Sequence, residues 1–252
     1  MTGRLDIVGL GPGDPRLLTA EAAEAVAEAT DLVGYATYLE RLPMRLGQRR
    51  HASGNREELA RARHALTLAA SGHRVAVVSS GDPGVFAMAS AVFEAIEFGE
   101  PDWRALDVQV IPGISAIFAA AARIGAPLGH DFCAISLSEN LKPWPVVTAR
   151  LKAAAVAGFV IALYNARSQT RPWQLGAAFD LLRPMLPGET FVVFAIAVTR
   201  PDERIVISTL AEADPMQADM RTLVLIGSAA LRPIERPAAP PWLYAPRGES
   251  AA

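Results

Sequence analysis

Three apolar runs in the first half of the chain each end in a turn rich in glycine and proline. The runs and their turns are residues 5–10 with Gly9-Leu-Gly-Pro-Gly-Asp14, residues 74–79 with Ser80-Gly-Asp-Pro-Gly84, and residues 108–111 with Pro112-Gly113. Short, continuous, β-branched runs are typical of buried parallel strands. A helical pattern follows each turn: an Ala/Glu-rich stretch that starts at Thr19, then residues 86–98 and 116–123. This alternation predicts an α/β fold in which helices cover both faces of a mainly parallel sheet.

The pattern changes after Gly129, where strands become more frequent than helices. The expected strands are residues 132–136, 159–163, 191–197, 205–209 and 223–226. This density predicts a second α/β domain, unlike the first, with a mixed sheet. We therefore expect an N-terminal domain at 1–113, a C-terminal domain at 114–235, and an irregular proline-rich tail at 236–252.

Composition excludes several classes of protein. The 252 residues are 51% hydrophobic and carry a net charge of −2, so the chain lacks the basic footprint of a nucleic-acid-binding domain. The longest apolar stretch, residues 153–163, is broken by Gly158 and is too short to span a membrane. No signal peptide is recognisable, so we expect a cytoplasmic protein. The single cysteine, Cys133, and four scattered histidines predict no metal site.

The first glycine turn resembles a dinucleotide-binding fingerprint only in part. Asp14 stands where the third glycine of that fingerprint belongs, Pro12 removes one N–H donor, and Pro15 delays the helix. A carboxylate at this position disfavours a phosphate. An NAD-dependent oxidoreductase and a tight turn without any ligand are nevertheless kept as alternatives.

The second and third turns stand where open α/β sheets bind ligands, at the carboxyl ends of parallel strands. Gly81 and Gly84 permit close approach of the backbone, and Asp82 is placed to bind a ribose hydroxyl or another polar group. Ser115 offers a hydroxyl at the start of a helix. The alternatives are that the second turn is only a turn and that Ser115 only caps its helix.

Together the three loops, VGLGPGD, SSGDPGVF and VIPGISA, resemble the tetrapyrrole methylase family in order and spacing. The resemblance extends from about Leu5 to Gly227. It is strongest toward members that methylate precorrin-3B at C-17 and contract the macrocycle, through residues 33–39, 125–138 and 163–175. It implies two unlike α/β domains, S-adenosylmethionine as cofactor, a tetrapyrrole substrate, a homodimer, and no nucleic-acid or membrane partner. A non-catalytic tetrapyrrole carrier and a methylase for another ring position or a cobalt-containing macrocycle remain open.

The resemblance also implies which residues contact the cofactor. These are Ser80, Gly81, Asp82, Val85, Ser115, Ala116, Tyr164, Asn165, Ala195 and Ile226. The chain departs from the family at two segments. The usual YNPxS reads Tyr164-Asn-Ala-Arg-Ser168, and the usual RNxGR reads Ile196-Ala-Val-Thr-Arg200, which leaves the cofactor contacts of the second segment open.

Substrate and acid–base residues follow from the chemistry that the resemblance implies. A precorrin carries several carboxylates, which arginine recognises well. Arg45 and Arg49, in the basic run 41–51, are the candidates, together with Gly11, Pro12 and Gly13 of the first turn; the alternative is a solvated helix face. Ring contraction needs a positioned acid or base. The candidates are Asp14, His130 and Asp131, which otherwise only close their own turns.

Overall fold

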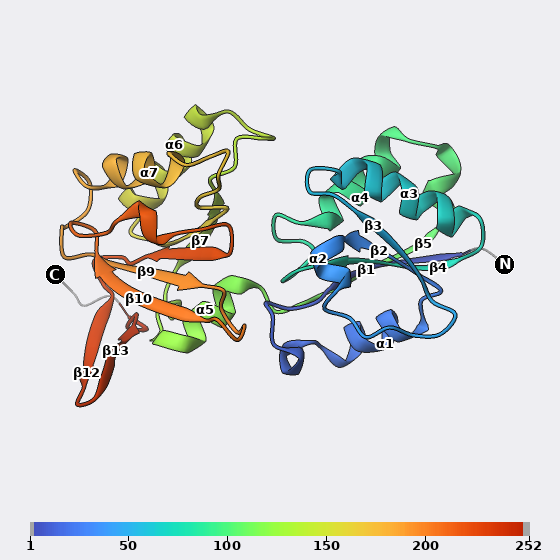
Figure 1. Ribbon diagram of the computed structural model, residues 1–252. Helices are drawn as coiled ribbons and strands as arrows, with labels where there is room; N and C mark the ends of the chain where they lie inside the picture. The colour runs from blue at the N-terminus through green and yellow to red at the C-terminus, as the bar shows by residue number, and fades with distance from the viewer. Residues whose placement is uncertain (1–2, 249–252) are drawn as a thin grey trace. The chain divides into compact units, whose positions relative to one another are not determined.

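The computed structural model describes residues 3–248, and the chain divides into two compact units, residues 1–115 and 116–252 (Figure 1). The predicted boundary at 113/114 lies just before this division. Each unit has its own sheet and its own hydrophobic core.

Unit 1 contains a five-stranded sheet in the order β3-β2-β4-β1-β5. Its strands are β1 (Arg4–Gly9), β2 (Asp31–Tyr35), β3 (Arg49–Ser53), β4 (Arg74–Ser79) and β5 (Asp107–Ile111). Its helices are α1 (Ala20–Glu28), α2 (Ala36–Leu39), α3 (Glu58–Ala70) and α4 (Met88–Phe98), with 3-10 turns η1 (Pro15–Leu17) and η2 (Pro101–Ala105). Every strand pair is parallel, which confirms the predicted parallel sheet.

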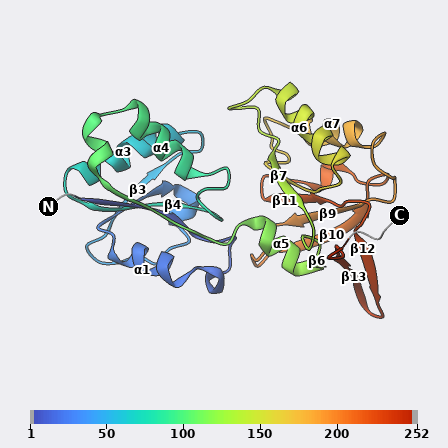
Figure 2. The same ribbon diagram turned by 180° about the vertical axis from the view of Figure 1, so that it is seen from behind.

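Helices cover both faces of this sheet (Figures 1 and 2). On one face α3 and α4 pack on Leu5, Ile7 and Val77, and on the other α1 packs on Val8 and Leu32. The two central strands are therefore buried on both sides, as continuous apolar runs require. Because β1 pairs with β4 in parallel, the carboxyl ends of the two strands lie beside each other.

Strand β3 was not among the predicted strands. Its sequence, Arg-Arg-His-Ala-Ser, lacks an apolar run because β3 lies at the edge of the sheet and is only partly buried. Edge strands commonly carry charged side chains, which oppose pairing with other chains. Residues of the basic run thus lie on a strand and not on the face of a helix.

Unit 2 contains a second five-stranded sheet in the order β10-β9-β11-β8-β7. Its strands are β7 (Phe132–Ser136), β8 (Val160–Tyr164), β9 (Phe191–Ile196), β10 (Arg204–Thr209) and β11 (Thr222–Ile226). Only β7 and β8 pair in parallel, so the sheet is mixed, as predicted. Helices α6 (Trp144–Val156) and α7 (Gln174–Leu182) cover one face, α5 (Ala116–Ile124) lies against the other, and η3 (Pro215–Gln217) precedes β11.

The end of the chain forms a third, three-stranded sheet. It consists of β6 (Gly125–Ala126), β12 (Arg232–Arg236) and β13 (Ala239–Tyr244), in the order β12-β13-β6. The prediction of an irregular tail is therefore wrong for 239–244. Pro240 and Pro241 are tolerated because they fall at an irregularity in the register between the pairs Ile234–Trp242 and Arg236–Ala239. Residues 249–252 of that predicted tail lie outside the described residues.

Candidate functional site

The three glycine turns of unit 1 meet at the carboxyl edge of its sheet. The Gly11 N–H donates to the Gly81 carbonyl over 3.1 Å, and the Gly81 N–H donates back over 2.9 Å. A Cβ atom on Gly9 would lie 2.6 Å from the Gly113 nitrogen, and one on Gly113 would lie 2.2 Å from the Gly81 oxygen. Glycine is required at these positions because three backbones touch there.

Asp82 joins two of these turns through its carboxylate. One oxygen accepts the Gly84 N–H over 2.8 Å, and the other accepts the Gly113 N–H over 3.0 Å. The side chain that the sequence assigned to cofactor binding thus also holds the second and third turns together. A carboxylate can accept further hydrogen bonds, so these two leave capacity for a ligand.

Arg41 also lies at this carboxyl edge of the sheet. From the sequence it was noted only as part of the basic run 41–51. Its guanidinium donates from Nη1 to the Ser80 hydroxyl over 3.2 Å, and from Nη2 to the carbonyls of Leu10 and Gly11 over 3.2 and 3.3 Å. One cation therefore connects the first and second turns. No sequence motif signals this contact, because it depends on how the chain returns after β2.

The space beside Gly81 suits a cofactor. Gly81 has a left-handed backbone with φ of 69°, and a Cβ atom there would meet only the Ser115 Cα, at 3.8 Å. The neighbouring polar groups are the half-buried Ser80 and Asp82 and the buried Ser115, with Val85 as apolar neighbour in the same loop. Such a cradle of backbone and hydroxyl groups fits the polar amino-acid and ribose portions of S-adenosylmethionine.

The first turn is shaped differently. The Asp14 carboxylate accepts the Arg16 N–H over 2.9 Å and pairs with the Arg16 guanidinium over 2.6 Å, so it caps η1. Helix α1 begins only at Ala20, behind the cap Thr19. The N-terminus of α1 therefore does not lie at the glycine turn. A dinucleotide phosphate would bind at such a helix N-terminus, so this geometry disfavours the dinucleotide alternative. Gly11 and Pro12 are buried, whereas Gly13 and Asp14 are half-buried.

In unit 2 polar residues gather at the carboxyl ends of the parallel strands β7 and β8. The Asn165 side-chain amide donates to the Ser136 hydroxyl over 2.9 Å, and Asn165 itself has a φ of 53°. The Tyr164 hydroxyl accepts the Ile117 N–H over 3.1 Å and so ties this edge to the start of α5 beside Ala116. Ser136 was missed by the sequence analysis, although it ends its strand as Ser79 ends β4.

Two cofactor candidates of unit 2 lie at different levels of the sheet. Ala195 and Leu163 flank β11 opposite the consecutive residues Leu223 and Val224, close to the level of Tyr164. Ile226 is fully buried and pairs with Ile161 and Val192, toward the amino ends of β8 and β9. Ile226 remains a proposed cofactor contact, and it lies toward the opposite end of β8 from Tyr164 because β11 runs antiparallel to β8.

The segment after β9 that differs from the usual family sequence, residues 196–200, is a tight turn. Ala197 and Thr199 both have left-handed φ values, of 48° and 67°. The Glu203 carboxylate accepts the Thr199 N–H and also pairs with Arg123 of α5 over 2.9 Å. The segment is thus held by contacts of its own unit.

The acid–base candidates His130 and Asp131 lie at the other end of β7. They precede Phe132, its first residue, whereas Ser136 and Asn165 mark its carboxyl end. His130 Nδ1 is 3.8 Å from an Asp131 carboxylate oxygen, and the Asp131 side chain is 75% exposed. The structure does not bring these two residues to the polar cluster of unit 2.

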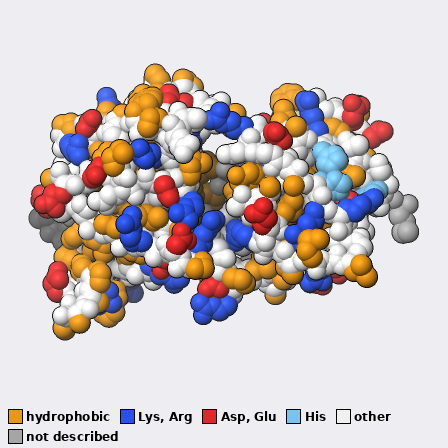
Figure 3. Space-filling view, viewed as in Figure 1, with side chains coloured by type: hydrophobic (Ala, Val, Ile, Leu, Met, Phe, Trp, Pro, Cys, Tyr) orange, Lys and Arg blue, Asp and Glu red, His pale blue; other side chains and the backbone are white. Residues whose placement is uncertain are grey.

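Arg49, a proposed substrate-binding residue, has a 59% exposed side chain and also forms an ion pair. Its Nε lies 2.9 Å from the fully buried Asp31 carboxylate, which also accepts hydrogen bonds from His51 and His73, each over 2.8 Å. Burial alone raises the pKa of Asp31, but hydrogen bonds from His73, Arg49 and His51 outweigh it and hold the pKa well below its usual value. Figure 3 shows the histidine patch on the surface of unit 1. Arg45 is exposed and remains a proposal.

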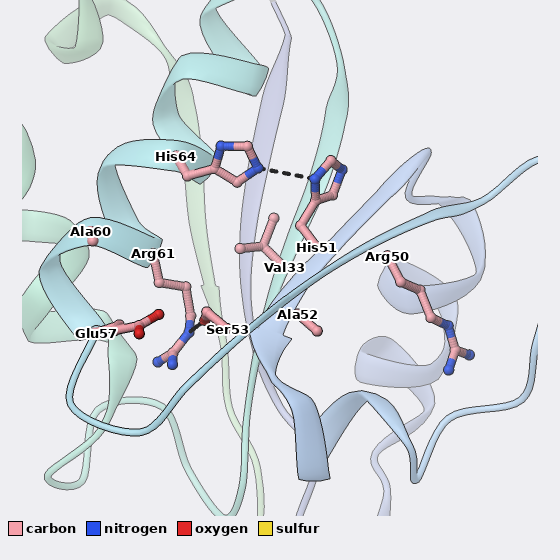
Figure 4. A pocket seen from close by; sticks show the side chains of 9 residues that line it. All are labelled: Val33, Arg50, His51, Ala52, Ser53, Glu57, Ala60, Arg61 and His64. Carbon is pink, nitrogen blue, oxygen red and sulfur yellow. Dashed lines mark hydrogen bonds between the residues drawn. The ribbon is translucent and has the colours of Figure 1, made fainter.

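A pocket of about 400 Å³ lies between the edge strand β3 and helix α3 (Figure 4). His51 and His64 share a hydrogen bond of 3.0 Å on one wall, and Arg61 donates to the Ser53 hydroxyl over 2.7 Å on another. Strand β2 separates β3 from β4, so this pocket lies to the side of the glycine turns. Within residues 3–248 no group of three or more His, Cys, Asp or Glu side chains is arranged for a metal ion, and no helix has the length and apolarity to cross a membrane.

Comparison with known proteins identifies the family of the chain. Residues 4–214 match the sequence model of the tetrapyrrole (corrin/porphyrin) methylases. The chain belongs to the tetrapyrrole methylases. In this family context the glycine turns of unit 1 and the Tyr164-Asn165 edge of unit 2 are the places where the sequence analysis expected the cofactor.

Individual relatives of this tetrapyrrole methylase are similar to it along most of its length. A precorrin-3B C(17)-methyltransferase of Sinorhizobium sp is 58% identical, covering 98% of this chain and 97% of that protein. A probable cobalt-factor III C(17)-methyltransferase of Salmonella typhimurium is 41% identical, covering 89% and 92%. The crystal structure of the methyltransferase CobJ superposes with a TM-score of 0.93 at 50% identity, covering 97% of this chain and all of that one.

Proposed function

We propose that this tetrapyrrole methylase transfers a methyl group from S-adenosylmethionine to C-17 of precorrin-3B, with contraction of the macrocycle to precorrin-4, in cobalamin biosynthesis. The observation that carries the proposal is the 58% identity with a precorrin-3B C(17)-methyltransferase along both chains. Its support in the structure is the convergence of three glycine turns at one sheet edge.

The residues proposed to hold the cofactor act mainly through their backbone. They are Ser80, Gly81, Asp82, Val85, Ser115, Ala116, Tyr164, Asn165, Ala195 and Ile226. When bound, the cofactor would supply an electrophilic methyl group. The sulfonium sulfur would keep the electron pair of the broken sulfur–methyl bond. The protein contributes alignment of the acceptor carbon, which requires no nucleophilic side chain.

Asp14 is the acid–base residue proposed here, because it lies in the turn that follows β1. Its side chain is 16% exposed and is paired with the solvent-exposed Arg16. A positioned proton donor or acceptor contributes roughly 10² to 10⁴ in rate. Asn in its place keeps the capping oxygen of η1 but does not exchange a proton. Asp14→Asn is therefore expected to slow ring contraction more than methyl transfer, and equal, unchanged rates of both steps would remove Asp14 from the mechanism.

The deciding experiment is incubation of the purified chain with precorrin-3B and methyl-labelled S-adenosylmethionine, followed by mass spectrometry. We expect one labelled methyl group on the macrocycle and a contracted ring. Binding of the macrocycle without label would instead indicate a carrier. Binding of NAD, with no S-adenosylmethionine bound, would indicate an oxidoreductase.

A cobalt-containing acceptor is the second candidate, because a relative at 41% identity is named a probable cobalt-factor III C(17)-methyltransferase. Parallel assays with the metal-free and the cobalt-containing macrocycle decide between the two through kcat/KM. We also propose that the chain acts as a homodimer, and a monomeric mass by light scattering would refute this.

A further inference from the structure

Arg61 differs from the other buried charged side chains in the part of the chain that the structure describes. These side chains are Asp6, Asp31 and Arg61, which are 6%, 0% and 6% exposed. Asp6 pairs with Arg4 over 2.8 Å, and Asp31 pairs with Arg49 over 2.9 Å. Arg61, by contrast, has only neutral hydrogen-bond partners among residues 3–248. A buried charge is costly unless an opposite charge compensates it, so the guanidinium lacks an adjacent counter-ion.

The neutral partners of Arg61 hold its side chain in place without using all its donors. Nε donates to the Ser53 hydroxyl over 2.7 Å, and Nη2 donates to the Gly54 carbonyl over 2.6 Å. Nη1 donates to the Met88 sulfur over 3.3 Å, and a thioether is only a weak acceptor. A guanidinium has five N–H donors, so two remain after these three bonds. A further acceptor can therefore bind to a cation that is already positioned.

Arg61 lines the pocket between β3 and α3 (Figure 4). The volume of about 400 Å³ is sufficient for a small organic anion. Arg50 contributes to the same pocket, but its guanidinium points away from Arg61 in Figure 4 and donates to the carbonyls of Leu39, Leu42 and Pro43. Arg61 is therefore the arginine of this pocket that is available to a ligand.

Glu57 is the acidic residue among those that line the pocket. It is exposed, and its carboxylate accepts the Gly54 N–H over 3.1 Å. Burial lowers the pKa of Arg61, and the charges of Glu58 and Glu57 offset this effect only in part. Because water and salt screen an exposed carboxylate, Glu57 weakens an anion site in this pocket without closing it.

We propose that the pocket between β3 and α3 is a binding site for a small oxyanion, a phosphate or carboxylate group, with Arg61 as its buried cation. The guanidinium fork matches both groups, and hydrogen bonds between ionised partners are roughly twice as strong as neutral ones. The ligand supplies to Arg61 the opposite charge that Asp6 and Asp31 receive from arginines of the chain itself. The pocket lies to the side of the glycine turns, so the proposal does not depend on methyl transfer.

The test is a titration of the full chain with inorganic phosphate and, separately, with acetate, followed by NMR. We expect saturable shifts of the Gly54 amide signal and the Arg61 Nε signal with at least one of the two anions. Arg61→Met should weaken binding about tenfold, because it removes the charge but keeps an apolar stem. Glu57→Gln should tighten binding about threefold, because the amide keeps the bond to Gly54 and removes the opposing charge.

Arg63→Met is the matched control. Arg63 is exposed on the same helix and does not line the pocket, so this variant should bind the anion as the wild type does. It separates a specific site from general attraction to a basic surface.

Four results would overturn the proposal. They are the absence of a saturable shift with either anion, wild-type affinity in Arg61→Met, equal weakening in Arg61→Met and Arg63→Met, and binding to Glu57→Gln that is no tighter than to the wild type. The last comparison decides the matter where Arg61→Met does not fold. Failure of these tests leaves methylation of precorrin-3B unaffected, and a wild type without methyltransferase activity leaves the anion site unaffected.

Discussion

The carboxylate of Asp82 accepts a hydrogen bond from the backbone N–H of Gly113 over 3.0 Å. The two residues belong to different turns, one after β4 and one after β5, and β1 lies between these strands in the sheet. A single side chain thereby fixes the spacing of two strand ends. Because the acceptor is charged, such a bond contributes roughly 1.5 to 3 kcal/mol.

Asp82→Asn tests this link. The amide has one oxygen, so it can satisfy either Gly84 or Gly113 while presenting an NH₂ group to the other. We expect a loss of about 1 to 3 kcal/mol in the free energy of unfolding and weaker binding of S-adenosylhomocysteine. Urea denaturation and titration calorimetry measure the two effects. Asp102→Asn, at an exposed position of η2, is the control. Equal stability of both variants would show that the bond to Gly113 is dispensable.

Arg41→Met tests the second connection between turns. The variant keeps the apolar stem but loses the donors to the Ser80 hydroxyl and to the carbonyls of Leu10 and Gly11. We expect S-adenosylhomocysteine to bind about tenfold more weakly, because two turns lose their common donor. Calorimetric titration measures this change. Arg45→Met, in the exposed segment that follows, should bind normally, and a similar loss in both variants would indicate a general charge effect.

Because the Asp31 carboxylate is buried and paired, we expect the free energy of unfolding to depend on pH. The pKa of Asp31 is lower in the folded chain than in the unfolded chain, where it is near 3.9. Its stabilising contribution is therefore complete above that unfolded value and is lost as the pH falls through the folded pKa. We expect Asp31→Asn to destabilise the chain by about 2 to 3 kcal/mol near neutral pH and by less at about pH 3.5.

Urea denaturation of wild type and Asp31→Asn across that pH range measures the difference. Asp131→Asn serves as control, since its side chain is 75% exposed. A difference between wild type and Asp31→Asn that stays constant or grows toward acidic pH would contradict the assigned ion pairs.

Tyr164→Phe probes the contact between β8 and α5. The variant removes the oxygen that accepts the Ile117 N–H, a donor that has no partner within the helix because it lies in the first turn of α5. We expect a loss of about 1 kcal/mol and a melting temperature lower by a few degrees. Tyr244→Phe on β13 is the matched control. Calorimetry that shows no difference between the two variants would mean that water replaces the hydroxyl.

Buried elements were predictable from the sequence because their residues follow simple rules. Residues 74–79 and 132–136 form strands with the predicted bounds, since they are apolar runs ended by turns or polar residues. The glycine turns were predictable as a group, since Gly9, Gly81 and Gly113 are needed where backbones touch. Their convergence follows from the parallel order of β4, β1 and β5.

Features that depend on tertiary contacts escaped prediction. The edge strand β3 has no apolar pattern, and β13 contains prolines that only its irregular register accommodates. The ion pair of Arg49 was not predicted, because its partner Asp31 lies eighteen positions earlier on the neighbouring strand. The positions of His130 and Ile226 relative to Tyr164 were not predicted either, because strand direction, which local sequence does not encode, decides which end of a strand a residue occupies.

The pairing of β6 with β13 affects the order in which the chain can fold during synthesis. Strand β6 lies early in unit 2, directly after α5, whereas its partner β13 is the last strand within the described residues. The sheet of unit 1 has all its strands once β5 has left the ribosome, and a domain commonly folds as soon as it is complete. The third sheet must wait for residues 239–244, so a nascent chain can hold a finished first unit while β6 still lacks its partner strand.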